Sequence, residues 1–173
     1  MEKKDLKPAG VFKYFEEICQ VPRPSKKEEK IIAYLKAFGV KHNLETNVDE
    51  AGNVLIKKPA TPGKENLQTV ILQSHIDMVC EKNNDVQHDF LTDPIETEID
   101  GEWLKAKGTT LGADNGIGVA TELAILADDN IEHGPLECLF TVDEETGLTG
   151  AFELKEGFMS GDILLNLDSE DEG

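Results

Sequence analysis

Three short apolar runs restrict the folds open to this chain more than any other feature of its sequence. They cover residues 69–72, 136–142 and 163–167, and each contains β-branched side chains. Runs that are apolar at most positions, without strict alternation, suit strands covered on both faces, as in a parallel sheet. We therefore expect these three segments to be strands of one buried, largely parallel sheet.

Helical and hairpin patterns surround these runs. Ser25 and Glu28 have the spacing of a capping box, which predicts the start of a helix. The expected helices cover residues 11–19, 26–42, 117–127 and 148–154, and the expected hairpins cover residues 44–56 and 95–106. Alternation of this kind predicts an α/β fold with a mixed, mostly parallel central sheet flanked by helices.

Composition excludes several classes of partner. The 173 residues include 17 Lys and Arg against 35 Asp and Glu, a formal net charge of −18. So acidic a surface repels phosphate backbones and anionic lipids, so we expect no nucleic-acid or membrane partner. The sequence shows neither a signal peptide nor a spanning segment, and Cys19, Cys80 and Cys138 lack metal-type spacing. These features predict a cytoplasmic protein with reduced thiols.

Candidate functional residues follow the expected strands directly. His75 and Asp77 come after the first run, Glu144 and Glu145 after the second, and Asp168 after the third. A fourth locus, Asp114, precedes the helix at 117–127. The successive intervals are 39 residues from His75 to Asp114, 31 from Asp114 to Glu145 and 23 from Glu145 to Asp168. Because parallel strands carry sites at their carboxyl ends, we expect all four loci at one sheet edge.

One imidazole and several carboxylates form a ligand set typical of a hydrolytic zinc centre. Carboxylates brought this close together would repel one another unless divalent cations were present. In an extended chain, residues i and i+2 point the same way, so Asp77 could hold the second ring nitrogen of His75.

Ordinary structural explanations exist for each residue on its own. Asp114 could cap a helix, the acids at 143–145 could complement a helix dipole, and Asp168 could begin a solvated tail. A non-catalytic acidic module that binds calcium or a basic partner is a further alternative. Calcium prefers six to eight oxygens, often from one loop, whereas these acids are dispersed and include a histidine. The combination therefore favours zinc.

Four segments of the sequence resemble aminoacyl-histidine dipeptidases, which are co-catalytic zinc exopeptidases related to aminoacylases and carboxypeptidases. The segments are residues 75–79, 108–118, 143–151 and 166–170. The resemblance implies two divalent cations, zinc above all, with cobalt or manganese as possibilities. It implies that His75 and Asp168 bind one zinc, Asp114 bridges both, Glu145 binds the second, Glu144 is the general base and Asp77 orients His75. It also implies a cis peptide bond between Asp114 and Asn115 and an Xaa-His dipeptide as substrate.

Members of that family are much longer than this sequence. They carry a lid or dimerisation domain after the region of Asp168, then return to complete the catalytic sheet and supply another zinc-binding histidine. Residues 1–173 are therefore expected to be the N-terminal part of a metallopeptidase catalytic domain, without the lid domain and the C-terminal catalytic segment. Such a chain should be weakly active or inactive, and its unfinished sheet edge invites homo-oligomers. Another zinc exopeptidase or an N-acyl amino acid deacylase is the alternative enzyme.

Overall fold

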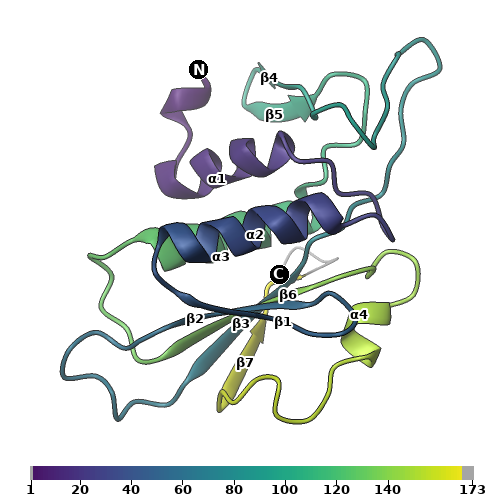
Figure 1. The fold of residues 1–173 in the computed structure, drawn as a ribbon. Helices are drawn as coiled ribbons and strands as arrows, with labels where there is room; N and C mark the ends of the chain where they lie inside the picture. Colours follow the sequence, from purple (N-terminus) through teal and green to yellow (C-terminus); the bar gives the residue numbers. More distant parts are fainter. Residues whose placement is uncertain (1, 169–173) are drawn as a thin grey trace.

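A computed structural model describes residues 2–168 of the chain. Its centre is a five-stranded sheet with the order β1-β2-β6-β3-β7 (Figure 1). The strands are β1 (Glu45–Val48), β2 (Val54–Lys58), β3 (Val70–His75), β6 (Leu136–Thr141) and β7 (Ile163–Asn166). β3 pairs in parallel with β6 and β7, while β1, β2 and β6 pair antiparallel. The α/β class and the mixed sheet predicted from the sequence are confirmed.

Three long helices lie on one side of this sheet: α1 (Ala9–Cys19), α2 (Glu29–Lys41) and α3 (Ala113–Ala127) (Figure 1). Their apolar faces enclose the main core together with alternate residues of the strands, including Leu72, Cys138 and Phe140. The intervening strand residues, Leu55 and Ile71 among them, face the other side. That side is covered by apolar side chains from residues 154–159, which follow the four-residue helix α4 (Thr149–Phe152).

A short 3-10 helix (Lys3–Asp5) precedes α1, and a separate hairpin is formed by β4 (Thr97–Asp100) and β5 (Trp103–Ala106). Gly101 occupies the turn of that hairpin with a φ of 62°, a left-handed conformation that glycine adopts without steric cost. Within residues 2–168, no helix has the length and apolarity required to cross a bilayer.

The predicted capping box is wrong. α2 begins at Glu29, and Glu28 stands before it without a capping hydrogen bond from its side chain. The Ser25 hydroxyl instead donates to Asp77 at 2.7 Å, and the Glu28 carboxylate accepts the backbone N–H of Asp143 at 3.0 Å. Contacts with distant loops have replaced the local capping contacts that the spacing suggested.

Glu122, on α3, is a fully buried acid in the main core. Among the described residues, neither of its carboxyl oxygens makes a hydrogen bond. Burial raises the pKa of Glu122 well above its usual value, and the neighbouring Ser74 hydroxyl and Cys138 thiol offset this only in part. Burial therefore favours the neutral form of this carboxyl group.

The variant Glu122→Gln tests this protonation state. Above the pKa of an unfolded glutamate the unfolded chain releases a proton that the folded chain keeps, so the wild type loses stability as pH rises. We expect its free energy of unfolding to fall relative to Glu122→Gln by up to about 1.4 kcal/mol per pH unit as the pH rises from the pKa of an unfolded glutamate, about 4.3, toward the raised pKa of the folded one. Urea unfolding at several pH values measures this.

Glu137→Gln is the matched control. Burial opposes ionisation of Glu137, but hydrogen bonds from Ser160 and the ion pair with Lys57 outweigh it and lower the pKa of Glu137. The wild type should therefore gain stability relative to this variant as pH rises through the range where glutamate titrates. If the difference in free energy of unfolding between the wild type and Glu122→Gln did not change with pH, the assignment of a neutral carboxyl group to Glu122 would be contradicted.

β7 is an edge strand of the sheet, and no strand pairs with its outer side among residues 2–168. Ile163, Leu164 and Leu165 are 39%, 48% and 48% exposed, so apolar side chains are exposed on both faces of this strand. An apolar edge with free backbone groups is a template for pairing with another chain.

We therefore expect the 173-residue chain to self-associate through β7, and Leu164→Lys to reduce that association. Size-exclusion chromatography with light scattering over a concentration series measures the mass. Val40→Lys, on the exposed surface of α2, is the control because it adds the same charge away from the sheet edge. A wild-type chain that stays monomeric at high concentration would refute the expectation.

Candidate metal centre

The ends of the parallel strands bring the predicted residues to one edge of the sheet. His75 is the last residue of β3, and β6 and β7 run parallel to β3 on its two sides. Glu144 therefore emerges beside His75 on one flank, and Asp168 on the other. Asp114 reaches the same place from the start of α3, where its φ and ψ of −82° and 117° depart from helical values.

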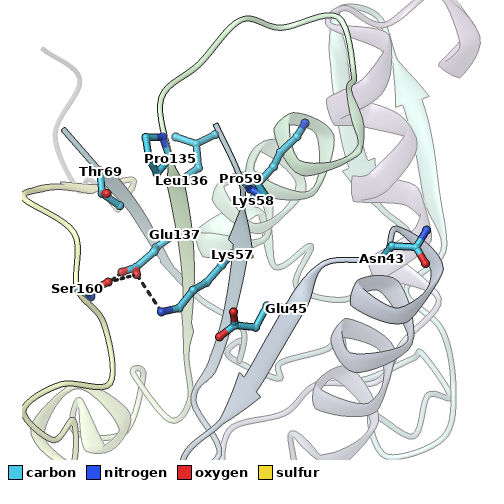
Figure 2. A pocket seen from close by; sticks show the side chains of 10 residues that line it. All are labelled: Asn43, Glu45, Lys57, Lys58, Pro59, Thr69, Pro135, Leu136, Glu137 and Ser160. Carbon is cyan, nitrogen blue, oxygen red and sulfur yellow. Dashed lines mark hydrogen bonds and ion pairs between the residues drawn. The ribbon is translucent and has the colours of Figure 1, made fainter. Parts of the chain in front are cut away.

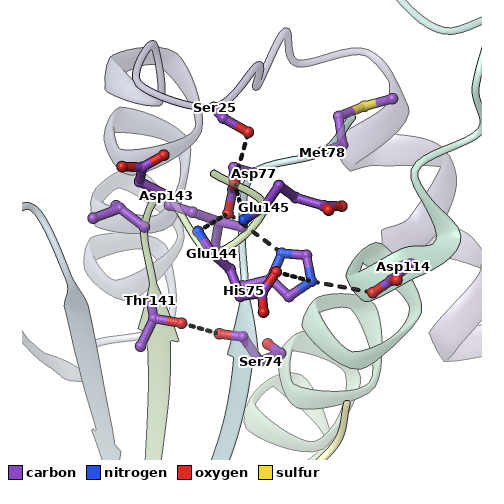
Figure 3. Close-up of polar contacts among 12 residues, drawn as sticks. Ser25, Ser74, His75, Asp77, Met78, Asp114, Thr141, Asp143, Glu144 and Glu145 are labelled. Carbon is purple, nitrogen blue, oxygen red and sulfur yellow. Dashed lines mark hydrogen bonds and ion pairs between the residues drawn. The ribbon is translucent and has the colours of Figure 1, made fainter. Parts of the chain in front are cut away.

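Three of these side chains converge on one point. The Nε2 atom of His75 lies 3.1 Å from Oδ1 of Asp114 and 3.8 Å from Oδ2 of Asp168. One potential donor atom from each of the three residues lies within 4.8 Å of the others. Glu144 is close by, with Oε2 at 3.9 Å from the same ring nitrogen (Figure 3).

Glu145 is not part of this cluster in the described residues. Figure 3 shows its side chain extending toward Met78, apart from the contact between His75 and Asp114. Its backbone N–H donates to Asp77 at 3.2 Å, so the position of the residue is fixed while its carboxylate points elsewhere. The predicted role of Glu145 as a ligand to a second cation therefore remains a prediction.

Asp77 is fully buried behind the cluster. Its Oδ1 atom lies 3.3 Å from Nδ1 of His75, which leaves Nε2 facing the carboxylates. The same carboxylate accepts the Ser25 hydroxyl and the backbone N–H groups of Glu144 and Glu145. One anion therefore orients the imidazole and holds the loop that follows β6 (Figure 3).

The electrostatics of the site are strongly acidic. Burial opposes charge on the His75 ring, but Asp77, Asp114 and Glu144 outweigh it and raise the pKa of His75 to about 9. Burial, followed by the like charges of neighbouring acids, raises the pKa of Glu144 and that of Glu145. In the described part of the chain, none of the acids at this edge pairs with a lysine or arginine.

The structure does not favour the ordinary explanation for Asp114. Gly112 occupies the N-cap position of α3, which has no capping hydrogen bond from a side chain. The Asp114 carboxylate instead contacts His75, and its peptide bond to Asn115 is cis, as the resemblance implied. Asp143 differs, because its carboxylate accepts the hydroxyls of Thr146 and Thr149 and so holds the turn after β6.

A second cluster of acids, Glu28, Asp77 and Asp143, lies deeper and is wholly buried. Peptide N–H groups and hydroxyls already donate to all three carboxylates. These donors satisfy the acids without a cation.

A groove of about 450 Å³ lies at the opposite end of the strands (Figure 2). Glu137 is its buried acid, and that carboxylate accepts the Ser160 N–H and hydroxyl and pairs with Lys57 at 3.2 Å. Because these partners satisfy Glu137, its carboxylate is not free for chemistry.

Comparison with known proteins identifies the family. The model of Peptidase family M20/M25/M40 matches residues 71–169, more than half of the chain and nearly all of the segment from β3 to the region of Asp168. The chain belongs to peptidase family M20/M25/M40. All the residues proposed above as metal ligands lie inside the matched segment.

Two relatives of this M20 chain are close in sequence. The cytosol non-specific dipeptidase of Escherichia coli is 52% identical over 172 residues, which cover 99% of this chain and 36% of the relative. The crystal structure of an aminoacylhistidine dipeptidase from Vibrio alginolyticus is 55% identical with a TM-score of 0.96, over 100% of this chain and 35% of that one. The chain thus spans about a third of the length of these relatives.

The fold extends to more distant peptidases. The crystal structure of aminopeptidase PepT from Bacillus cereus is 27% identical with a TM-score of 0.79, and the match covers 94% of this M20 chain and 43% of that protein. These likenesses agree with the family resemblance that the motifs carried.

The residues of the M20 site fit a divalent cation. An imidazole nitrogen and two carboxylates converge, and no positively charged lysine or arginine competes for them in residues 2–168. The side chain of Asp114 is 68% exposed, which leaves the site open to water and substrate.

Binding of Zn²⁺ should therefore raise the melting temperature of the chain, and Asp114→Asn should reduce that increase. A cation held at 100 times its dissociation constant adds about 2.7 kcal/mol to the free energy of unfolding. Differential scanning fluorimetry with zinc or with a chelator measures the change. Glu102→Gln, an exposed acid in the β4–β5 turn, is the control. An equal zinc-dependent increase in Asp114→Asn would place the cation elsewhere.

Proposed function

We propose that this chain provides most of the metal-binding residues of a dipeptidase that uses two divalent cations, zinc above all, to hydrolyse dipeptides with a free N-terminus. The observation that supports the proposal most strongly is the convergence of His75, Asp114 and Asp168 within 4.8 Å, with the buried Asp77 behind the ring. The names of the two close relatives, a non-specific dipeptidase and an aminoacylhistidine dipeptidase, support the substrate class, with Xaa-His dipeptides as the first to test.

The proposed roles of the residues are those that the family resemblance implies, and the positions of His75, Asp114 and Asp168 support them. His75 and Asp168 would hold one cation, Asp114 would contact both, and Glu145 would turn toward the second. Bound cations would supply Lewis acidity, polarising the peptide carbonyl and lowering the pKa of water. Asp77 keeps Nδ1 of His75 engaged, so that Nε2 stays free to act as a ligand.

Glu144 is the proposed general base. Its carboxylate is partly exposed and lies 3.9 Å from the ring nitrogen of His75, at the rim of the cluster. From there it can accept a proton from water as the peptide carbonyl is attacked, and return that proton to the leaving amine. Its backbone N–H donates to Asp77, so the same buried anion positions both the base and the imidazole.

The proposed activity belongs to a larger assembly of residues than this chain contains, because the close relatives are almost three times as long. We therefore propose that the 173-residue chain by itself is a weak or inactive catalyst that still binds metal. The cytoplasm is the proposed location, since the Escherichia coli relative is a cytosol dipeptidase and the three cysteines are free thiols.

Glu144→Gln tests the base in an active context. A chimera in which this chain replaces the matching segment of the Escherichia coli dipeptidase should hydrolyse Xaa-His dipeptides. Glu144→Gln should lower kcat by about 10²–10⁴-fold because proton transfer is lost, while metal content by mass spectrometry stays at the wild-type level. Glu153→Gln, on the exposed surface after α4, is the matched control.

Several outcomes would contradict the proposal. Turnover retained in Glu144→Gln would remove Glu144 as the base. Hydrolysis of N-acyl amino acids in preference to dipeptides would favour a deacylase, and calcium as the bound metal would favour a non-catalytic module.

A further inference from the structure

Arg23 is a buried cation in the short connection between α1 and α2. Among the described residues it forms no ion pair with a carboxylate. A charged group in the interior costs free energy unless hydrogen bonds compensate for lost water. The hydrogen-bond partners of Arg23 therefore indicate which segments of the chain its buried guanidinium group holds together.

Within residues 2–168 its guanidinium group donates only to backbone carbonyls. One terminal nitrogen donates to the carbonyls of Ile76 and Asp77, each at 3.1 Å, and the other donates to the carbonyl of Gly112 at 2.5 Å. Ile76 and Asp77 directly follow His75, and Gly112 is two residues before Asp114. The planar fork of one arginine thus joins the two chain segments that carry the closest pair of candidate ligands.

Two glycines make room for this group. A Cβ atom at Gly112 would lie 2.6 Å from a terminal nitrogen of Arg23, and one at Gly116 would lie 2.7 Å from the same atom. Gly112 also has a φ of 66°, which favours glycine. Gly112 and Gly116 therefore admit the guanidinium group to the start of α3.

The residues that follow Arg23 fix its position relative to the loop after β3. Pro24 forms an isolated parallel bridge with Met78, so this connection runs beside the loop that follows β3. Ser25, two residues after Arg23, donates to the Asp77 carboxylate. Two side chains of this connection thus bind the same loop: Arg23 binds its backbone carbonyls and Ser25 binds the Asp77 carboxylate.

We propose that Arg23 is a positioning residue of the metal centre, which holds the loop after β3 and the start of α3 at the separation that lets His75 and Asp114 share a cation. This inference rests on the proposed function, because it assigns Arg23 a role only if a cation binds there. Arg23 itself touches neither the cluster nor a substrate.

The test compares Arg23→Met with Lys58→Met in the 173-residue chain. Lys58 is also a buried cation, and it donates to the carbonyls of Ile125 and Asp128 at the far end of α3. Both variants remove a cation that anchors one end of the same helix, so both should lower the melting temperature. Only Arg23→Met should weaken zinc binding, by about 10–100-fold, in competition with a chromophoric chelator.

Two further measurements separate positioning from a loss of fold. The visible absorption of bound Co²⁺ reports ligand geometry, and it should change in Arg23→Met and stay unchanged in Lys58→Met. Arg23→Lys keeps the charge without the fork, so its zinc affinity should lie between those of the wild type and Arg23→Met. If circular dichroism shows that Arg23→Met is unfolded, the zinc affinity and Co²⁺ absorption of Arg23→Lys are used in its place.

Wild-type zinc affinity and Co²⁺ absorption in a folded Arg23 variant would overturn this inference and leave the proposed function intact. Failure of the wild-type chain to bind zinc or cobalt would overturn both. Equal weakening in Lys58→Met would show a general effect of helix anchoring and would also overturn the role of Arg23.

Discussion

The carboxylate of Asp77 accepts hydrogen bonds from the turn before α2 and from the loop after β6, and it faces the ring of His75 from behind. Its charge is compensated by neutral donors and by that ring, and among the described residues no lysine or arginine forms an ion pair with it. A buried anion satisfied in this way is costly to displace, because each donor would be left without a partner. Three segments of the chain are therefore located relative to one another by a single side chain.

The rest of the site follows from the direction of the strands. β3, β6 and β7 run the same way, so acids that follow them collect at one edge whether or not a cation is present. Burial raises the pKa of Glu144 and that of Glu145, the charge of His75 offsets this in part, and neighbouring acids add to it, so ionising both carboxylates in this arrangement is unfavourable. A fold that accepts such a cost at one place is typical of a functional site rather than of a surface chosen for stability.

The strands, and the sheet edge at which the candidate ligands lie, could be predicted from the sequence because both depend on local patterns. Apolar runs mark buried strands, and parallel pairing then determines where His75, Asp114 and Asp168 must meet. The capping box predicted from the spacing of Ser25 and Glu28 was wrong, because a local pattern cannot show that the distant residues Asp77 and Asp143 offer better hydrogen-bond partners. No sequence pattern predicted the burial of Arg23, because it depends on Gly112 and Gly116, which are remote in the chain.

Diffraction from crystals of the chain grown with zinc, recorded at the zinc absorption edge, tests the central claim most directly. The account predicts an anomalous peak about 2.0–2.2 Å from Nε2 of His75 and from carboxylate oxygens of Asp114 and Asp168. A peak at the buried cluster of Glu28 and Asp143, or only at a histidine outside the proposed site such as His42 or His133, would contradict it.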